Sequence, residues 1–334
     1  MRKMPLKPDK GGKGIEKGKG SKTAFVSGGG GKVGMALSKA LLENGYKVHA
    51  LSHQKDFVHT MPAGVIPFVG EITDEKIINE ACRGVDVVFH LAAIVSEYKA
   101  PTKRLLEVNV EGTKNVLEAC RRNGIKHIIF SSSIDVYGRT RKEKLTEESR
   151  LRPEDKYGYS KMLAEKEVHR YGNRIGYTIL RVAAIYGNGF ERSYFKLFEA
   201  VKDGKAYIIG DGNNSLALVH IDDVVNAFML SAEKRNSINK VYNVGDGVAY
   251  TQSGLMDKVA GMLGVEKPRR HISPVVVKLV ARSRGLDSDE LRFLMSDRII
   301  DISAIKRDLG FNPRVNIDQA GLGLVKDFIK KRGL

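Results

Sequence analysis

Tyr157 and Lys161 are the two residues of this chain best suited to acid–base chemistry. They stand four positions apart, so in a helix their side chains lie on one face, a turn apart. A lysine cation beside a phenol favours the phenolate, which lowers the pKa of the tyrosine. Such a tyrosine can exchange a proton with a substrate hydroxyl or carbonyl near neutral pH. Because the pattern Tyr-x-x-x-Lys arises by chance in many helices, its context decides its meaning.

A glycine-rich turn follows the first expected strand, residues 23–27, and leads into an amphipathic helix. Its spacing is Gly-x-x-Gly-x-x-Gly at Gly28, Gly31 and Gly34. Such a turn needs unusual backbone angles, lets a pyrophosphate approach the backbone and seats the helix tightly on the strand. The N–H groups at the helix start then attract phosphate. A merely flexible loop is the alternative, but the strand before and the helix after favour dinucleotide binding.

Strands and helices alternate through the first half of the chain. Further strands are expected at residues 47–51, 65–69, 86–91 and 126–130, and one long helix is expected at residues 104–122. This alternation predicts a parallel sheet with helices on both faces, whose ligands bind beyond the carboxyl ends of the strands. The glycine turn, Ala92-Ala93 and the serine run 131–133 all fall at that edge. His90 ends a strand there and is expected to be a packed, hydrogen-bonded residue rather than a catalytic one.

Composition narrows the class of protein. The chain has 334 residues and a net charge of +17, enough length for one large domain or two smaller ones. Residues 1–22 hold eight Lys or Arg, two acids and five glycines, which predicts a disordered basic tail. An arm for RNA or an acidic surface is the alternative, but nothing later resembles a nucleic-acid-binding module, and we expect no nucleic-acid partner.

The apolar runs and the two cysteines of the chain indicate the cellular compartment in which the protein is expected. No apolar run reaches the roughly 18 residues that would cross a bilayer, and the basic start lacks the apolar core of a secretory signal, so we expect no membrane partner. Cys82 and Cys120 share no Cys-x-x-Cys spacing. They are expected to be reduced, mostly buried thiols of a cytoplasmic protein. No cluster with metal-ligand spacing is found, and we expect no metal.

The end of the second strand bears on cofactor choice. An NAD-specific fold usually places an acid there to hold the ribose diol. Here the strand runs into Ser52-His53-Gln54-Lys55, with no acid. Lys32, His53 and Lys55 could attract a 2′-phosphate, so the sequence leans weakly towards NADP over NAD, although His is mostly neutral at pH 7.

With these motifs in place, the chain resembles the extended short-chain dehydrogenases/reductases, in the NAD-dependent epimerase/dehydratase group. The matching motifs are Ser27–Gly34, His90–Ala93, Asn109–Thr113, Ser131–Gly138, Tyr157–Lys161, Leu180–Gly187, Val219–Asp223 and Leu309–Pro313. They follow the family order over residues 23–330.

The resemblance implies roles for individual residues. Ser133, Tyr157 and Lys161 match the catalytic trio: Tyr157 is the acid/base, Lys161 lowers its pKa and binds the nicotinamide ribose, and Ser133 donates to the substrate oxygen. Lys32 and Val33 carry backbone contacts to phosphate, Glu71 and Ile72 flank the adenine, and Ala183 lies near the nicotinamide. The residues expected to contact NAD or NADP are Gly28, Gly31, Lys32, Val33, Gly34, His53, Glu71, Ile72, Leu91, Ala92, Ala93, Asn109, Ser131, Tyr157, Lys161 and Ala183. The resemblance also implies a homodimer through a helix bundle.

Departures from the family pattern bear on the substrate. Family dehydratases follow the catalytic Ser or Thr with two acids, whereas here Ile134 replaces the first and only Asp135 remains. An apolar residue cannot protonate a leaving hydroxyl, which argues against a sugar 4,6-dehydratase. Typical nucleotide-sugar epimerases have Asn where this chain has Ala184, and a diphosphate-binding Arg where it has Leu216. Arg192 and Arg292 could compensate, but the sequence does not place them.

The expected fold class is α/β, a Rossmann-type doubly wound parallel sheet with a smaller C-terminal substrate-binding α/β cap. Residues 23–180 are expected to form the dinucleotide-binding domain, with 219–245 returning to it. Residues 181–218 and 246–334 are expected to form the substrate-binding region. Within it, residues 274–283 read as a helix apolar almost all round, expected to be core rather than a lipid or sterol pocket.

Three functions stay open on the sequence. The first is an NAD(P)-dependent oxidoreductase that transfers hydride at a hydroxyl or ketone carbon of a small molecule, with Tyr157 as acid/base. The second is a nucleotide-sugar epimerase with a modified diphosphate pocket. The third is a non-catalytic dinucleotide-binding subunit, which the intact Ser133/Tyr157/Lys161 set disfavours. Retained NAD would favour an epimerase, and exchangeable NADP(H) would favour a reductase.

Overall fold

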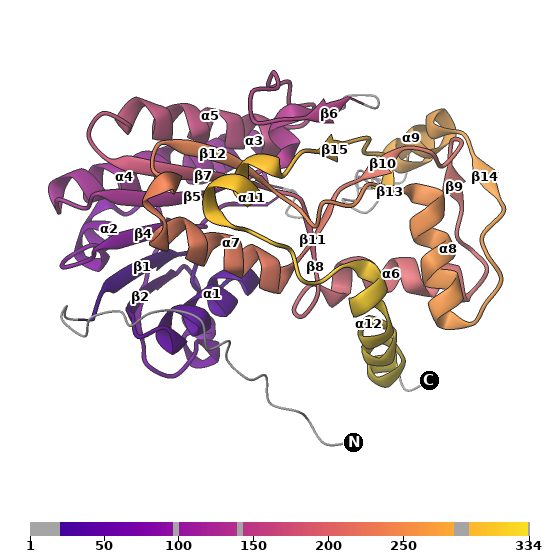
Figure 1. Cartoon of the computed structure of the whole chain (residues 1–334), viewed down its shortest axis with the longest axis horizontal. Coiled ribbons are helices and arrows are strands. Elements are labelled where there is room, and N and C mark those ends of the chain that lie inside the picture. The colour runs from indigo at the N-terminus through magenta and orange to yellow at the C-terminus, as the bar shows by residue number, and fades with distance from the viewer. Residues whose placement is uncertain (1–20, 96–99, 139–142, 284–293, 333–334) are drawn as a thin grey trace.

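Seven parallel strands form the central sheet in the computed structural model of the chain (Figure 1). Their order is β12-β7-β5-β4-β1-β2-β3. Their bounds are β1 Thr23–Ser27, β2 Lys47–Ser52, β3 Val65–Val69, β4 Val87–His90, β5 His127–Ser133, β7 Gly176–Val182 and β12 Lys240–Val244. The structure describes residues 21–95, 100–138, 143–283 and 294–332. The order reverses direction beside β1, and this places a crevice between the carboxyl ends of β1 and β4.

Helices cover both faces of the sheet, which confirms the predicted doubly wound fold. On one face lie α1 (Lys32–Glu43), α7 (Ile221–Glu233) and α11 (Ser303–Leu309). On the other lie α2 (Glu75–Ala81), α4 (Gly112–Arg122) and α5 (Lys156–Tyr171). The short helix α3 (Thr102–Leu106) leads through a π-turn, η2 (Glu107–Glu111), into α4.

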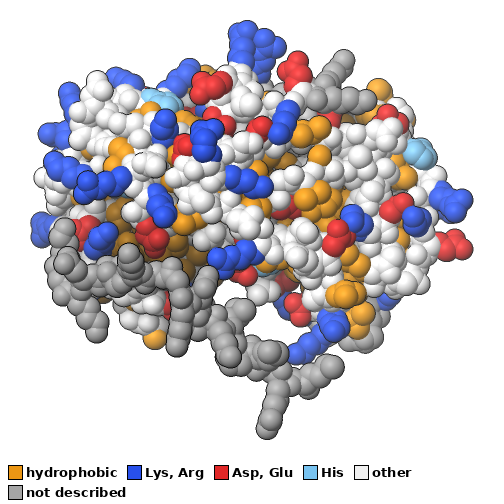
Figure 2. Space-filling view, viewed as in Figure 1, with side chains coloured by type: hydrophobic (Ala, Val, Ile, Leu, Met, Phe, Trp, Pro, Cys, Tyr) orange, Lys and Arg blue, Asp and Glu red, His pale blue; other side chains and the backbone are white. Residues whose placement is uncertain are grey.

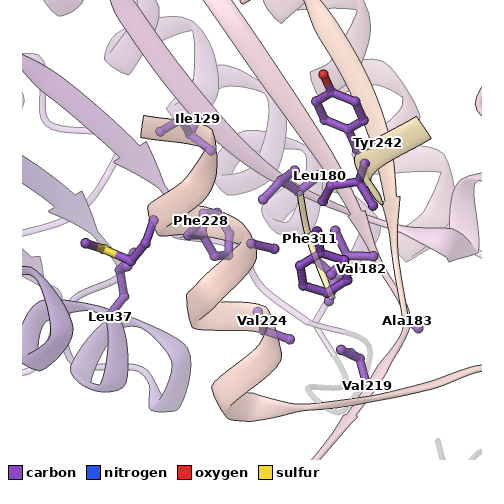
Figure 3. Close-up of a cluster of buried hydrophobic side chains, with 14 of the residues drawn as sticks. Leu37, Ile129, Leu180, Val182, Ala183, Val219, Val224, Phe228, Tyr242 and Phe311 are labelled. Carbon is purple, nitrogen blue, oxygen red and sulfur yellow. The ribbon is translucent and has the colours of Figure 1, made fainter. Parts of the chain in front are cut away.

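The core under α7 shows how the first face is held (Figure 3). Phe228 and Val224 of α7 lie among Leu37 of α1 and Leu180 of β7, and all four are almost fully buried. Removing a buried Phe side chain typically costs about 3–5 kcal/mol. This packing fixes α1 on the sheet and, with it, the glycine turn at the start of α1.

A smaller α/β unit follows in the second half of the chain, on the right of Figure 1. Short strands pair there as β8 (Ala184–Tyr186) with β11 (Leu218–His220), β9 (Ile208–Ile209) with β14 (His271–Ile272), and β10 (Ser215–Leu216) with β13 (Tyr250–Thr251). Its helices are α6 (Glu191–Lys202), α8 (Gln252–Leu263), α9 (Pro274–Ser283) and α12 (Ile317–Arg332). A third apolar cluster, with Phe198, Leu216 and Phe328, holds this unit together. The pair β6 (Lys144–Leu145) and β15 (Ile299–Ile300) ties it to the first half.

Two expectations need correction, and one lies outside the described residues. Of the segment 219–245, β12 joins the main sheet, but β11 pairs with β8 instead, because β8 carries the chain from β7 into the cap and β11 runs alongside it. Helix α9 is not core: Val275 is 73% exposed and Leu279 67%. Residues 1–20, most of the predicted basic tail, are outside the described ranges.

Charged side chains are spread over the face of the molecule shown in Figure 2, where Lys and Arg lie over both halves with Asp and Glu among them. Several charged side chains form exposed ion pairs, such as Lys39 with Glu43 and Arg104 with Glu71. Exposed pairs of this kind contribute little to stability, about 0–1 kcal/mol each.

Candidate active site

The glycine turn at the end of β1 fits a pyrophosphate. Gly28 has a φ of +74°, and a Cβ there would lie 2.9 Å from the backbone nitrogen of Ala92. A Cβ on Gly34 would overlap the carbonyl oxygen of Gly28, so α1 packs against the turn at backbone distance. Gly31 caps α1 without a side-chain hydrogen bond, and the first turn holds no acid. The N–H groups at the start of the helix are therefore not claimed by a capping side chain, as binding of a dinucleotide requires.

His90 secures the tip of β4 beside this turn. The Ser27 hydroxyl accepts hydrogen bonds from the backbone N–H groups of Leu91 and Ala92, and donates to His90 Nδ1 at 2.7 Å. On the other side of the ring, the Thr113 hydroxyl donates its single proton to the carbonyl of Asn109. Thr113 therefore accepts in its hydrogen bond with His90, and His90 Nε2 is the donor. Burial, with a smaller effect of the Lys161 charge, lowers the pKa of His90 to about 3. His90 is thus a neutral, packed residue.

Asn109 lies in the π-helical segment η2 between α3 and α4, where hydrogen bonds run from residue i to i+5. It is 2% exposed and accepts a hydrogen bond from the N–H of Ile94 while donating to the carbonyl of Ile94 and to Ser160. Asn109 thereby joins the segment after β4 to helix α5. Leu91, Ala92 and Ala93 are partly exposed at the same strand end.

The adenosine side of the predicted site lies at the ends of β2 and β3. Ser52 is buried and turns the chain by bonding to the backbone of Gln54, which leaves His53 and Lys55 exposed. Glu71 is exposed and pairs with Arg104 at 2.8 Å, while Ile72 is buried against Gly112.

Two further predicted contacts lie nearer the cap. The Lys32 ammonium stands 4.7 Å from the ring centroid of Phe190. Ala183, at the end of β7, is buried and bonds through its N–H to Val244 of β12. Lys32 therefore contacts the segment that follows β8, and its ammonium lies over an aromatic ring.

Helix α5 brings Tyr157 and Lys161 to the end of β5. Asp155 caps the helix by accepting the N–H of Gly158 at 2.6 Å. A Cβ on Gly158 would lie 2.5 Å from the carbonyl oxygen of Asp135, so only glycine lets the first turn of α5 pack so closely on the turn η3 (Ile134–Tyr137). That turn begins at Ser133, so helix α5, which carries Tyr157 and Lys161, packs against the end of β5 where Ser133 lies.

Lys161 is 3% exposed, whereas Tyr157 is partly exposed. The Lys161 ammonium lies 4.3 Å from the ring centroid of Phe130 in β5. Burial lowers the pKa of Lys161 to about 7, and the charge of Glu165, one turn further along α5, opposes that shift. The lysine can therefore gain or lose a proton near neutral pH, which is the range in which an acid–base site works.

A buried ion pair lies behind Lys161. Arg181 of β7 donates two hydrogen bonds to Glu165, at 2.8 Å and 3.0 Å, and both side chains are at most 5% exposed. Ser132 donates to the same carboxylate, and Arg181 also donates to the Tyr137 hydroxyl. Tyr137 in turn donates to Asn243 of β12. Every charge in this network has hydrogen-bond partners, as burial of charge requires.

Ser133 is held by a second chain of polar contacts. Its hydroxyl donates to Asp135 Oδ2 at 2.9 Å and accepts the N–H of the same residue. The other oxygen of Asp135 binds Arg298, which also donates to the carbonyl of Gly138. In this arrangement the Ser133 proton is directed at Asp135.

The structure places several of the positions at which the sequence departs from the pattern of the family that it resembles. Ile134 is 5% exposed and Leu216 is fully buried in the core of the cap, so neither offers a polar group to a ligand. Ala184 is partly exposed. The side chain of Arg192 and the whole of Arg292 lie outside the described residues. Among the residues that the structure does describe, no group of three or more potential metal ligands occurs.

Sequence reasoning missed Glu165, Arg181 and Arg298. A signal existed for the first two: Glu165 continues the four-residue spacing of Tyr157 and Lys161, and Arg181 is a charge inside an apolar strand, which needs a buried partner. Arg298 meets Asp135 across 163 residues of chain, and no local pattern marks that contact.

Fold and site together define a class of protein with a parallel sheet of the dinucleotide-binding type and a Tyr-x-x-x-Lys helix at the end of its fifth strand. Residues 24–245, more than half of the chain, match the model of the NAD-dependent epimerase/dehydratase family. The chain therefore belongs to that family.

Two curated relatives and one solved structure illustrate the range of this family. The N-acetyl-alpha-D-glucosaminyl-diphospho-ditrans,octacis-undecaprenol 4-epimerase of Escherichia coli O157:H7 is 30% identical over 61% of this chain and 62% of its own length. The 2-alkyl-3-oxoalkanoate reductase of Stenotrophomonas maltophilia is 27% identical over 88% of this chain and 96% of its own. The UDP-glucose 4-epimerase of Thermotoga maritima, solved with UDP-glucose, has 26% identity and a TM-score of 0.75, covering 93% of this chain and 100% of that one. Solved structures of the same fold also contain NAD.

Substitution of Gly158 by Ala tests the close packing of α5 on η3. We expect Gly158→Ala to lower the free energy of unfolding by about 1–3 kcal/mol, because the added methyl group would meet the Asp135 carbonyl. The matched control is Gly323→Ala in α12, where a Cβ meets nothing within 4 Å. That change should leave stability equal or raise it by up to about 1 kcal/mol. Urea unfolding measures both, and equal stability of Gly158→Ala and wild type would contradict the packing.

Substitution of Lys161 by Met tests the buried cation. Burial lowers the pKa of Lys161 in the folded protein, so below about pH 7 the folded protein keeps a buried charge. Between about pH 7 and 10 the unfolded chain binds one proton more than the folded protein at this residue, so this residue makes wild-type stability rise with pH. Lys161→Met should therefore be more stable than wild type at pH 6, by up to several kcal/mol at about 1.4 kcal/mol per pKa unit, and lose this advantage near pH 10. The exposed neighbour Lys166→Met is the control and should follow wild type. Identical pH dependence of Lys161→Met and wild type in urea unfolding would argue against the burial.

Proposed function

We propose that this protein is an NAD(P)-dependent oxidoreductase that transfers hydride at a hydroxyl or ketone carbon, with Tyr157 as acid/base and Ser133 and Lys161 as its partners. The observation that carries the proposal is the placement of a buried, near-neutral lysine one turn after Tyr157, on a helix packed against the turn that begins at Ser133. A protein that only bound a dinucleotide would not need this arrangement.

The side chains divide the work. The nicotinamide of NAD or NADP supplies the hydride chemistry when bound. Tyr157 gives its phenol proton to the substrate oxygen during reduction, or takes the hydroxyl proton during oxidation. For oxidation Tyr157 must begin as a phenolate, and Lys161 stabilises that phenolate because its ammonium stands on the same helix face. Ser133 turns from Asp135 to donate to the substrate oxygen, where a positioned donor contributes a few kcal/mol to the transition state.

The cofactor contacts are part of the same proposal. The glycine turn and the N–H groups at Lys32 and Val33 bind the pyrophosphate, and Glu71 and Ile72 flank the adenine. Leu91, Ala92, Ala93 and Ser131 line the crevice at the strand ends. Asn109 supports that crevice through Ile94 rather than through an exposed amide.

The substrate is proposed to lack a diphosphate held in the manner of UDP-sugar epimerases. Leu216 takes the place of the diphosphate-binding arginine and is fully buried. Ile134 excludes the paired acids of a dehydratase. The match to a reductase over 96% of that relative's length is consistent with a hydroxyl or ketone substrate.

A nucleotide-sugar epimerase is the second candidate. It is favoured by the 26% identity to a solved UDP-glucose 4-epimerase over 93% of this chain. An epimerase recycles its cofactor and keeps it bound, whereas a reductase exchanges it. Analysis of nucleotide released from the freshly purified protein on denaturation separates the two candidates.

Assembly and location complete the proposal. We infer a homodimer through the paired outer helices α4 and α5, as the family resemblance implies. A cytoplasmic location is consistent with Cys82 and Cys120, which are buried free thiols. In the described part of the chain, no helix is long and apolar enough to cross a membrane.

Substitution of Tyr157 by Phe tests the acid/base assignment. We expect Tyr157→Phe to bind the dinucleotide normally but to lose turnover by about 10²–10⁴-fold, because the phenol proton is gone. Tyr159→Phe is the matched control: Tyr159 lies two residues away, is 46% exposed, and should leave turnover unchanged. Cofactor titration and oxidation or reduction of hydroxyl and ketone compounds, followed by NAD(P)H absorbance, measure both. Near-normal turnover of Tyr157→Phe would refute the assignment.

Cofactor choice is tested by direct titration. We expect NADP(H) to bind at least as well as NAD(H), because no acid ends β2 and His53 and Lys55 are exposed there. The preference should be tenfold or less, since exposed charge pairs contribute about 0.2–1 kcal/mol each. Titration of both cofactors at low salt measures the preference where exposed charges are least screened. A clear preference for NAD(H) would mean that another residue holds the ribose diol.

A further inference from the structure

The segment between β8 and α6, residues 187–190, reaches from the start of the cap to the glycine turn. The Lys32 ammonium lies 4.7 Å from the ring centroid of Phe190, and a Cβ on Gly189 would lie 3.5 Å from Cγ of Lys32. The ring of Phe190 therefore contacts the charged end of the lysine, while the backbone of Gly189 lies along its stem. These contacts join a cap segment to the first residue of α1, although the two are far apart in the sequence.

This segment extends along the edge of the sheet at which the dinucleotide is proposed to bind. The chain leaves β7 at Ala183, passes through β8 into the cap (Figure 1) and arrives beside Lys32 at Phe190. In the sheet order β7-β5-β4-β1, the ends of β7 and β1 are three strand spacings apart, or about 14 Å. The segment thus connects the proposed nicotinamide contact, Ala183, with the proposed pyrophosphate contact, Lys32.

The two ends of the segment are held in different ways. Gly187 has a φ of +110°, and a Cβ there would lie 2.6 Å from Nε2 of His220, so the base of the segment is packed at backbone distance. The N–H of Phe190 donates to the carbonyl of Gly187 and closes a turn. At the tip, Gly189 is exposed, Phe190 is partly exposed, and the partner Lys32 is itself exposed. The base is therefore fixed, whereas the tip is fastened to α1 through a contact with an exposed side chain.

We propose that residues 187–190 form a strap over the bound dinucleotide, and that the contact of Phe190 with Lys32 must break each time the cofactor enters or leaves. The strap rests on the proposed cofactor site and deepens it, because it makes Phe190 a positioning residue that sets the rate of cofactor exchange. The contact should slow both steps by a factor of about two to five, equivalent to the roughly 0.5–1 kcal/mol of an exposed cation–π pair.

The strap bears on both candidate functions. A reductase releases its oxidised or reduced cofactor in every turnover, and opening of a lid limits the rate of many enzymes of that kind. An epimerase gains from a closed strap, because it keeps its cofactor bound. The exchange rate set by Phe190 is therefore a property of the cofactor site in either case.

The test compares the association and release of NADPH and of NADH by stopped-flow fluorescence. It uses the full-length protein after removal of any nucleotide that copurifies, and excess oxidised cofactor starts the release. Phe190→Ala should raise both rate constants by about twofold to fivefold and leave Kd unchanged, because the contact opposes entry and exit alike. Phe190→Tyr keeps the ring and should behave as wild type. Phe190→Leu keeps apolar bulk without a π-face and should behave as Phe190→Ala.

Substitution of Lys32 tests the other side of the contact. Lys32→Met also removes a charge beside the pyrophosphate, so it should weaken binding by itself. In a chain that already carries Lys32→Met, Phe190→Ala should change either rate by less than about twofold, because the contact is already absent. The matched control is Lys39→Met, which removes an exposed charge from the same helix at a position away from the turn. In that background Phe190→Ala should keep its full effect.

Each other result overturns the strap, and thermal unfolding first confirms that every variant is folded. Unchanged rates in Phe190→Ala, with binding by wild type, would refute the strap and leave the proposed cofactor site intact. Faster release alone, with weaker affinity to match, would make Phe190 an ordinary cofactor contact. Faster association alone would mean that Lys32 leaves the ring for a phosphate, so that the strap does not close over bound cofactor. Absence of NADPH and NADH binding by wild type would refute the strap together with the cofactor site.

Discussion

The buried ion pair between Glu165 and Arg181 is the interaction on which the site depends. Its charged atoms are 2.8 Å apart, and both side chains are almost fully enclosed. Removing one partner of such a pair typically costs about 3–5 kcal/mol, because the other charge stays buried. Glu165 lies on the same helix as Lys161, and Arg181 lies on β7. Through Ser132 and Tyr137 the pair also reaches β5 and the turn η3. One shared network thus links helix α5 to β5, β7 and the turn η3.

This network also sets the electrostatics around Lys161. Burial beside Phe130 disfavours the ammonium, and the carboxylate of Glu165 partly restores it. The result is a lysine that changes charge near neutral pH, one helical turn after Tyr157, the proposed acid/base. A second chain of contacts, from Arg298 through Asp135 to Ser133, connects the cap to the same reacting edge. Substrate bound under the cap would therefore meet groups whose hydrogen bonds are already arranged.

The sequence predicts the parts of this protein that depend on local pattern. The alternating strands, the glycine turn and the four-residue spacing of Tyr157 and Lys161 all follow from short-range periodicity, and the fold is confirmed. Contacts between distant segments do not follow from it: Arg298 reaches Asp135 across the chain, and the pairing of β8 with β11 depends on the path of the cap. Helix α9 was wrongly expected to be core, because a run of valines shows that a helix is apolar but not whether another element covers it.

The most direct test of the account is the ionisation of Lys161 in the protein without cofactor. Lysine labelled with carbon-13 at Cε reports protonation of each side chain by nuclear magnetic resonance, and the signal absent from Lys161→Met identifies the residue. We expect this one signal to titrate near pH 7, well below the pKa of about 10.4 that is ordinary for a lysine. A Lys161 signal that titrates with the exposed lysines would contradict the buried acid–base site.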